Sequence, residues 1–418
     1  MTLRAVTGVQ AESRDVYEVA LELIQSAPGL LPPHQRLSLE ALAQTSAQTP
    51  GIDAKTLWKK LPTATKSDVF GNTTAKKSWL ADSLKRWSKL KRGLRLIPGA
   101  GSSPQFLSFR SDAGESESSS LGPMTDLMLQ AFGVDAANTI VVQAYPASLH
   151  LPSHLNVADL GPRLDLLKPA LPTLLNSFEN LIFVAQPDWL HRAVATGTLP
   201  PEYAKRYRFA LGGTHVPASL PLWLVEFLGE SPEFWAQRMV SLYGLSELGL
   251  GVGFTLPGDA AHRLTKGTNG EWLPQVFRTP PNRTLFENLG DQILVTDLRP
   301  DSWIRLARYQ TGDDGSYDPT TGLLTIRGRL KPSSACIRAE VVLDILHASP
   351  EIARNQFSHT IVRSNEIQIA FGKEIPPTHT RRLIENELQA SAIRPVAIEW
   401  ILVHETRFDV LRKPKIYE

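Results

Sequence analysis

A short peptide in the second half of the chain carries residue types that suit nucleotide chemistry. It lies between a strand-like run and a glycine-rich segment and reads Tyr243, Gly244, Leu245, Ser246, Glu247. The tyrosine ring offers a flat surface to a base, Gly244 permits close approach of the backbone, and Ser246 can donate to a phosphate. Glu247 supplies carboxylate oxygens of the kind that hold Mg²⁺. Taken alone, the peptide also fits a strand end followed by a turn and a surface acid.

A second candidate group ends another β-like run, at Thr311, Gly312, Asp313, Asp314, Gly315. A carboxylate held in a tight turn can accept two hydrogen bonds from a ribose diol, and Asp313 is the residue expected to do so. The alternative is an ordinary Asp-Gly hairpin turn built by Asp314 and Gly315.

Two basic segments complete the set of candidate groups. Arg329 closes a strand-like run, where its guanidinium could reach ribose and phosphate oxygens, or could simply be solvated at a domain boundary. Lys413, with Lys415 in reserve, lies in a basic segment at the end of the sequence. A lysine there can act as a mobile point charge for a carboxylate and an α-phosphate, or can merely face solvent.

The elements around these groups predict an α/β protein. From about residue 139, apolar strand-like runs at 139–145, 181–185 and 207–211 alternate with helical patterns near Trp189 and Leu222. Such alternation indicates a layered α/β body. An N-terminal helix is expected at 15–24.

The sequence pattern changes after Arg283. Three strand candidates at 292–295, 304–309 and 323–326 predict a small antiparallel sheet there. The remaining chain predicts a small α+β lid, made of a helix, a hairpin, a helix and a strand at 340–347, 360–362, 367–371, 379–390 and 397–403. The expected organisation is therefore a large layered α/β body over residues 1–328 and a mobile C-terminal lid over residues 329–418.

Composition excludes several classes of partner. The chain of 418 residues has 44 basic and 42 acidic residues and a net charge of +2, so no strong field favours nucleic acid or an anionic membrane. Cys336 is the only cysteine, which excludes an internal disulfide. It is expected to be a small buried apolar residue rather than an acyl-carrying thiol. Without a secretion signal or an apolar run long enough to span a bilayer, the expected location is the cytoplasm.

The order of these motifs resembles that in the adenylate-forming superfamily of acyl- and aryl-coenzyme A ligases. Their Tyr-Gly-x-Ser/Thr-Glu, Thr-Gly-Asp, Gly-Arg hinge and C-terminal lysine motifs follow one another as here, over roughly Leu61 to the C-terminus. The chain looks most like phenylacetate-coenzyme A ligase and the acyl-protein synthetases of bacterial luciferase systems. Residues 61–68 resemble their Leu-Pro-x-Thr-Thr-Lys-x-Asp signature, and Gly212 and Gly213 resemble the glycine pair of their acyl and adenine pocket.

The resemblance implies a role for each candidate residue. Tyr243 would face adenine, Ser246 a phosphate, Glu247 the Mg²⁺ ion, Asp313 the ribose hydroxyls, and Arg329 the ribose or phosphate edge. Lys413 is the expected adenylation lysine, because Arg412, Lys413, Pro414 looks like a degraded Gly-Lys-x.

The implied reaction uses ATP and Mg²⁺ to activate an aryl or fatty carboxylic acid to acyl-AMP, with release of pyrophosphate. The acyl group then passes to a thiol or amine acceptor, which is coenzyme A, an amine or a carrier protein.

The segment in the place of the phosphate loop departs from the family pattern. It spans 108–116, lacks the first glycine and carries two carboxylates, which would repel a polyphosphate, although Ser111 and Gly114 could still contribute donors. The segment 332–338 also lacks the usual hinge glycines, which weakens the expectation of coenzyme A as acceptor. The alternative function is a degenerate superfamily member that binds a nucleotide or a partner protein without catalysis.

Overall fold

The protein is described by a computed structural model, and its described residues form two compact units. Unit 1 takes its residues from Met1–Lys91 and Pro280–Tyr317, and unit 2 from Arg92–Thr279 and Asp318–Glu418. This division differs from a body and a lid that meet at residue 329, so the mobile lid stays a prediction. The structure describes residues 15–26, 28, 31–48, 51–70, 94–98, 107–111, 121–145, 155–245, 248, 252–259, 263, 273–279, 283–299, 306–330, 335–354 and 357–403.

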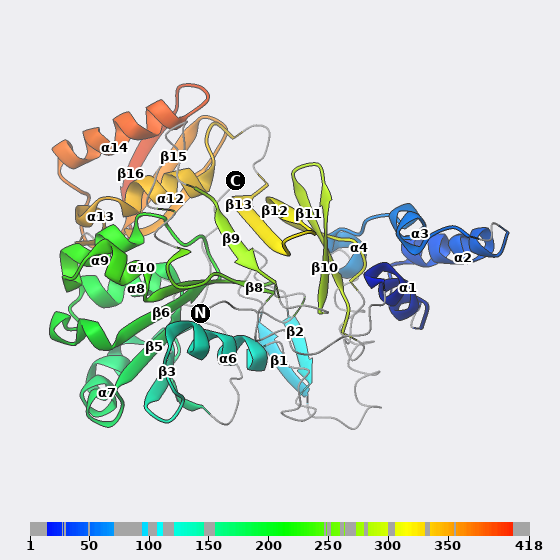
Figure 1. The fold of residues 1–418 in the computed structure, drawn as a ribbon. Helices are drawn as coiled ribbons and strands as arrows, with labels where there is room; N and C mark the ends of the chain where they lie inside the picture. The colour runs from blue at the N-terminus through cyan, green and yellow to red at the C-terminus, as the bar shows by residue number, and fades with distance from the viewer. Residues whose placement is uncertain are drawn as a thin grey trace. The chain divides into compact units, whose positions relative to one another are not determined.

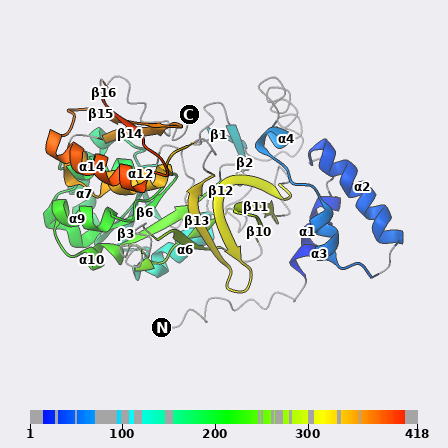
Figure 2. The same ribbon diagram turned by 90° about the horizontal axis from the view of Figure 1, so that it is seen from above.

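Unit 1 combines N-terminal helices with three strands that pair antiparallel. The predicted N-terminal helix is confirmed as the first of the four helices described in this unit, and α1, α2 and α3 lie side by side (Figure 2). Asp53 begins α3 by accepting a hydrogen bond from the backbone N–H of Thr56. The helices are α1 (Val16–Ser26), α2 (Pro33–Gln48), α3 (Ala54–Lys60) and α4 (Lys66–Phe70), and the strands, in sheet order, are β10 (Thr284–Leu289), β11 (Gln292–Asp297) and β12 (Tyr309–Asp318).

The helices and the strands of unit 1 share one apolar core. Ile24 of α1 and Trp58 of α3 pack in a cluster with Leu285 of β10. The indole N–H of Trp58 donates to the carboxylate of Glu287 at 2.8 Å, so this buried polar group is satisfied by the neighbouring strand.

Unit 2 is built on a mixed sheet, and the apolar runs predicted its strands β3, β5 and β6. Strands β4, β3, β5, β6 and β7 run parallel, and β8, β9 and β13 continue the sheet antiparallel (Figure 1). The bounds are β3 (Thr139–Gln143), β4 (Asn156–Asp159), β5 (Asn180–Ala185), β6 (Tyr207–Gly212), β7 (Met239–Tyr243), β8 (Gly253–Phe254), β9 (Gln275–Arg278) and β13 (Leu323–Arg329).

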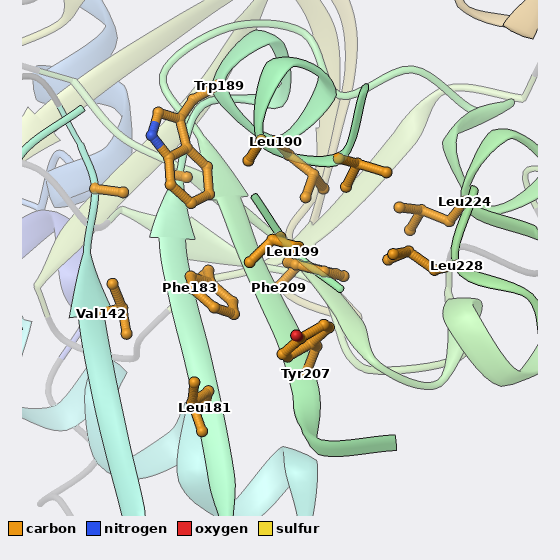
Figure 3. Close-up of a cluster of buried hydrophobic side chains, with 14 of the residues drawn as sticks. Val142, Leu181, Phe183, Trp189, Leu190, Leu199, Tyr207, Phe209, Leu224 and Leu228 are labelled. Carbon is orange, nitrogen blue, oxygen red and sulfur yellow. The ribbon is translucent and has the colours of Figure 1, made fainter. Parts of the chain in front are cut away.

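Helices cover both faces of the parallel strands, which explains why these strands read as continuous apolar runs. On one face, Val141 and Ile182 pack with Met128 of α6 (Leu121–Phe132). On the other face, Phe183 and Phe209 lie among residues of the remaining helices, as Figure 3 shows. Those helices are α7 (Leu164–Ser177), α8 (Pro187–Ala195), α9 (Leu220–Leu228) and α10 (Pro232–Ala236). The predicted α/β class is confirmed by this arrangement.

The C-terminal part of unit 2 follows the predicted order of elements. The predicted helix is followed by an additional short helix, an antiparallel hairpin, a helix and a strand that runs parallel to the second hairpin strand. The three strands form a separate sheet with its own apolar core, in which Cys336 is fully buried. Its elements are α12 (Ala339–His347), α13 (Pro350–Arg354), β14 (Phe357–Val362), β15 (Glu366–Phe371), α14 (Thr378–Ser391) and β16 (Ala397–Leu402). The shorter elements elsewhere are β1 (Leu94–Pro98), β2 (Leu107–Ser111) and a 3₁₀ helix at Pro201–Arg206.

The strand predicted at 304–309 is wrong at residues 306–308, and the alternative of a hairpin turn at Asp314 and Gly315 is excluded. Residues 306–308 are not in a strand, and β12 begins only at Tyr309. Asp314 and Gly315 lie inside β12 rather than in a hairpin turn, because the chain turns after Asp318. Among the helices that the structure describes, none is long and apolar enough to cross a membrane.

A buried polar cluster binds α12 to the loop that follows β6. Oδ1 of Asp344 lies 3.0 Å from Nε2 of His215 and accepts a hydrogen bond from the backbone N–H of Ala218 at 2.8 Å. Burial would raise the pKa of Asp344, but His215 and Arg263 outweigh this effect and hold that pKa below its usual value. The pairing therefore favours a charged Asp344 in the folded protein.

A second contact of α12 consists of aromatic rings. The ring of His347 lies edge-on to that of His191, with centroids 4.4 Å apart, and His191 stacks on Trp223 at 4.2 Å. Burial lowers the pKa of His347 to about 4, and burial together with His347 lowers the pKa of His191. Both rings are therefore neutral at pH 7.

These two histidines predict that the protein loses stability as the pH falls from 6.5 to 4. The unfolded chain, with a histidine pKa of about 6.5, binds protons in this range that the folded chain excludes. For His347 the shift corresponds to roughly 3 kcal/mol at its full extent. His347→Leu should flatten the dependence of the unfolding free energy on pH, measured by urea denaturation between pH 7.5 and 4.5. The exposed His379 on α14 provides the control His379→Leu, and equal slopes for the two variants would contradict the account.

Candidate functional site

The predicted glycine pair and the predicted tyrosine lie at the carboxyl ends of two neighbouring strands in the sheet of unit 2. Strands β6 and β7 are parallel and adjacent, with Gly212 opposite Leu242 in the register. Gly212 and Gly213 therefore lie beside Tyr243 and Gly244 at the carboxyl ends of these strands. Ligands of parallel α/β sheets bind outside this edge. The structure thus brings together two segments that sequence analysis selected separately.

Both positions of the glycine pair require glycine. A Cβ atom at Gly212 would lie 2.6 Å from the carbonyl oxygen of Leu242. Gly213 has φ +85°, and a Cβ atom there would collide with Oη of Tyr145. Backbone and side chain therefore approach each other here more closely than any other residue type would allow.

Tyr145 is a site residue that sequence analysis missed. It follows β3, which is separated from β6 by β5, and it reaches the same edge of the sheet. Only 5% of Tyr145 is exposed, and its pKa is raised by burial and then by the charge of Asp188. The phenol is therefore protonated at pH 7 and can donate a hydrogen bond to an anionic ligand. An aromatic residue directly after an apolar strand run was the available signal.

The ring of Tyr243 is half-buried and packs on β9. Its centroid lies 5.4 Å from that of Phe277, with the two planes tilted by 39°. Gly253 of β8 leaves room for this contact, since a Cβ atom there would lie 3.0 Å from Cβ of Phe277. The ring is thus held in place at the edge of the sheet, as a stacking surface for a base requires.

Asp313 belongs to unit 1, where it lies in a β-bulge. The register of β11 and β12 shifts between Gln292 opposite Asp314 and Leu294 opposite Gln310, so Thr311, Gly312 and Asp313 together face one residue of β11. Gly312 has φ +75°, and Oγ1 of Thr311 accepts from the backbone N–H of Asp313 at 3.1 Å. Bulges re-aim side chains and are frequent beside active sites. This bulge replaces the tight turn expected for Asp313.

The early signature segment and the Thr-Gly-Asp segment meet within unit 1. Ala64 bridges to Tyr309, its N–H donates to the carbonyl of Arg308 at 3.1 Å, and its carbonyl accepts from Gln310 at 2.8 Å. The side chain of Gln310 also donates to Oγ1 of Thr63 at 2.9 Å. Two motifs about 250 residues apart in the chain therefore share one backbone arrangement.

Arg329 is exposed at the end of β13, and its backbone is bound by the following helix. The N–H of Arg329 donates to Oε1 of Glu340 at 2.9 Å, and Glu340 is only 4% exposed. Gly328 has φ +137°, and a Cβ atom there would collide with the carboxyl group of Glu340. The predicted hinge thus begins with a peptide unit that α12 holds through a buried carboxylate.

Several predicted residues lie outside the described part of the chain, and their roles stay predictions. These are Ser246, Glu247, Gly114, Lys413 and its reserve Lys415. Ser111 ends β2, of which only the backbone is described. Within the described residues, no group of three or more His, Cys, Asp or Glu side chains is arranged to hold a metal ion. The Mg²⁺ site assigned to Glu247 is therefore untested.

Comparison with known proteins finds similarity among solved structures only. No family model and no curated protein matches the chain. An open conformation of 2-hydroxyisobutyryl-CoA ligase in complex with 2-HIB-AMP and CoA is 11% identical, with a TM-score of 0.49, over 96% of this chain and 90% of that one. The o-succinylbenzoate CoA synthetase from Bacillus subtilis is 12% identical, with a TM-score of 0.44, over 74% and 65%. At these values the functional proposal rests on the residues of the site.

The crowding at Gly213 predicts a large loss of stability for Gly213→Ala. The positive φ costs about 1–2 kcal/mol, and the collision with Tyr145 adds about 1–3 kcal/mol. Gly197→Ala is the matched control, because Gly197 has φ +68° and a Cβ atom there would meet no neighbour within 4 Å. Urea denaturation should show the larger loss for Gly213→Ala, and Gly213→Ala should cost less in a Tyr145→Ala background than in the wild-type protein. Equal losses for the two glycine variants would contradict the close packing.

Proposed function

We propose that this protein uses ATP to activate a carboxylic acid as acyl-AMP and then transfers the acyl group to a thiol or amine. The observation that carries the proposal is the edge of unit 2 where Gly212 and Gly213 lie beside Tyr243, with the phenol of Tyr145 packed on the second glycine. It joins a backbone surface free of side chains, an aromatic ring and a neutral hydrogen-bond donor. These are the parts that hold a base and an adjacent anion.

In the proposed reaction, a carboxylate oxygen attacks the α-phosphorus of ATP, the bond to the β-phosphate breaks, and pyrophosphate leaves. Tyr243 and the glycine pair hold the adenine, and Asp313 accepts hydrogen bonds from the ribose. Lys413 offsets the charge that develops on the phosphoryl oxygens, the kind of stabilisation that usually contributes most to such a step. Mg²⁺, held by Glu247, would supply further charge neutralisation. The acceptor is coenzyme A, an amine or a carrier protein, and the cytoplasm is the proposed location.

A second candidate function is nucleotide binding without catalysis, favoured by the two carboxylates in the segment 108–116. Calorimetric titration with ATP and with AMP separates the two functions. A catalyst should bind ATP at least as tightly as AMP in the presence of Mg²⁺. A protein that no longer binds the β- and γ-phosphates should still bind AMP. It should bind ATP markedly more weakly, because two carboxylates repel these phosphates.

The role of Tyr243 predicts that Tyr243→Ala weakens AMP and ATP equally. Loss of stacking on a base costs about 1–3 kcal/mol, which corresponds to roughly a 5- to 150-fold increase in the dissociation constant. Tyr203→Ala, at a tyrosine that is 37% exposed, is the control and should leave both constants unchanged. Unaltered nucleotide affinity in Tyr243→Ala would remove the tyrosine from the site.

The proposed role of Lys413 predicts a large effect on the first half-reaction, which forms acyl-AMP and releases pyrophosphate. Release of pyrophosphate from ATP should depend on a mixed library of carboxylic acids, and Lys413→Ala should lower its rate about a hundredfold or more. Lys415→Ala tests the reserve lysine of the same basic segment and should keep most of the activity, whereas the reverse pattern would assign the role to Lys415. Undiminished release from Lys413→Ala would exclude this lysine as the adenylation residue.

A further inference from the structure

A cavity of about 300 Å³ lies within unit 2. One of the loops that line it follows the glycine pair in the sequence, but neither glycine belongs to the lining. Its walls come from the loop after β6, from β7 and from β9, and they are mainly apolar. Val216 and Ala218 contribute from the loop, Met239 from β7 and Val276 from β9. The volume is at the lower end of the range for small-molecule sites, which is about 300–1,000 Å³.

A buried guanidinium lines this apolar cavity. Arg263 is 7% exposed, its Nε donates to the carbonyl of Leu273 at 3.1 Å, and one of its terminal nitrogens donates to the carbonyl of Val216 at 2.8 Å. Its other N–H groups have no acceptor among the residues that the structure describes. An arginine stays charged in a protein, and a buried charge is costly unless an anion or further hydrogen bonds compensate it.

The neighbouring carboxylates do not hydrogen-bond to Arg263. Asp344 acts on Arg263 electrostatically, but its Oδ1 is held by His215 and by the backbone of Ala218. Asp259 accepts from Arg278 at 2.6 Å, so these two charges at the cavity neutralise each other. Within the described lining, Arg263 is thus the buried cation that has donors left for a ligand and no carboxylate hydrogen-bonded to it.

Two hydroxyl groups of the lining also keep a donor. Oγ of Ser241 accepts from the side chain of Gln275, and Oγ1 of Thr255 accepts from the backbone N–H of Ser241, both at 2.8 Å. Each oxygen acts as an acceptor in its bond, so each hydroxyl proton remains available to a ligand.

We propose that this cavity binds a small monocarboxylate with an apolar body. The carboxylate accepts hydrogen bonds from Arg263 and from the hydroxyl of Ser241 or Thr255, and the body lies against Val216, Met239 and Val276. A planar guanidinium matches a carboxylate in geometry and charge, and the apolar walls match a hydrocarbon chain. The cavity is distinct from the proposed catalytic site, because its lining contains neither the glycine pair nor Tyr243.

Isothermal titration of the full chain without nucleotide tests the proposal, with octanoate as the probe and octanamide as its neutral counterpart. Wild-type protein should bind octanoate at least tenfold more tightly than octanamide. Arg263→Met should abolish this preference, and Val276→Phe, which fills the cavity and keeps the arginine, should abolish binding of both probes. Arg192→Met, at an arginine of α8 outside the cavity lining, is the matched control and should bind octanoate as wild type does.

Two results would overturn the proposal, whether or not the protein activates an acid with ATP. One is equal affinity of the wild-type protein for octanoate and octanamide, or no binding of either. The other is unchanged octanoate binding in Val276→Phe. Because the second variant leaves the hydrogen bonds of Arg263 intact, the test remains decisive even if Arg263→Met fails to fold.

Discussion

The fold of unit 2 depends on the parallel pairing of β6 and β7, which brings two backbone segments together with almost no side chain between them. Gly212 fits under the carbonyl of Leu242, and Gly213 in the left-handed region fits under Tyr145. Each contact is possible only because a Cβ atom is missing. The same absence leaves open backbone at the carboxyl edge of the sheet, beside the fixed ring of Tyr243. A packing constraint and a binding surface are therefore two aspects of one arrangement.

The polar groups buried behind this edge tie the C-terminal elements to the rest of unit 2. Asp344 and His347 are both on α12, and they contact the loop after β6 and α8 respectively. Glu340 of the same helix holds the peptide of Arg329. A rotation of the C-terminal part about the segment after Arg329 would have to break buried, charge-assisted bonds, which are costly to leave unmade. If the proposed enzyme moves this part during its cycle, the pair of His215 and Asp344 is the contact that opposes the motion.

Local sequence patterns predicted the strand and helix order of unit 2 because apolar periodicity and glycine placement are local signals. Tyr243 and the C-terminal elements were found this way, whereas the glycine pair was found through its resemblance to a family pattern. Tyr145 and Arg263 were missed, since their importance arises from contacts with residues far away in the chain. The bulge at Asp313 was also missed, because a register shift depends on the partner strand β11. The division into two units could not be predicted, since unit 1 is assembled from two segments that are separated by the whole of residues 92–279.

The central claim is that a carboxylate of the substrate attacks the α-phosphorus of ATP, and an isotope measurement tests it directly. The protein would be incubated with ATP, Mg²⁺, an acceptor thiol and carboxylic acids labelled with ¹⁸O in the carboxylate, and the nucleotide products analysed by mass spectrometry. The account predicts that one ¹⁸O atom appears in AMP and none in pyrophosphate. Formation of ADP and phosphate, or of AMP without ¹⁸O, would contradict it.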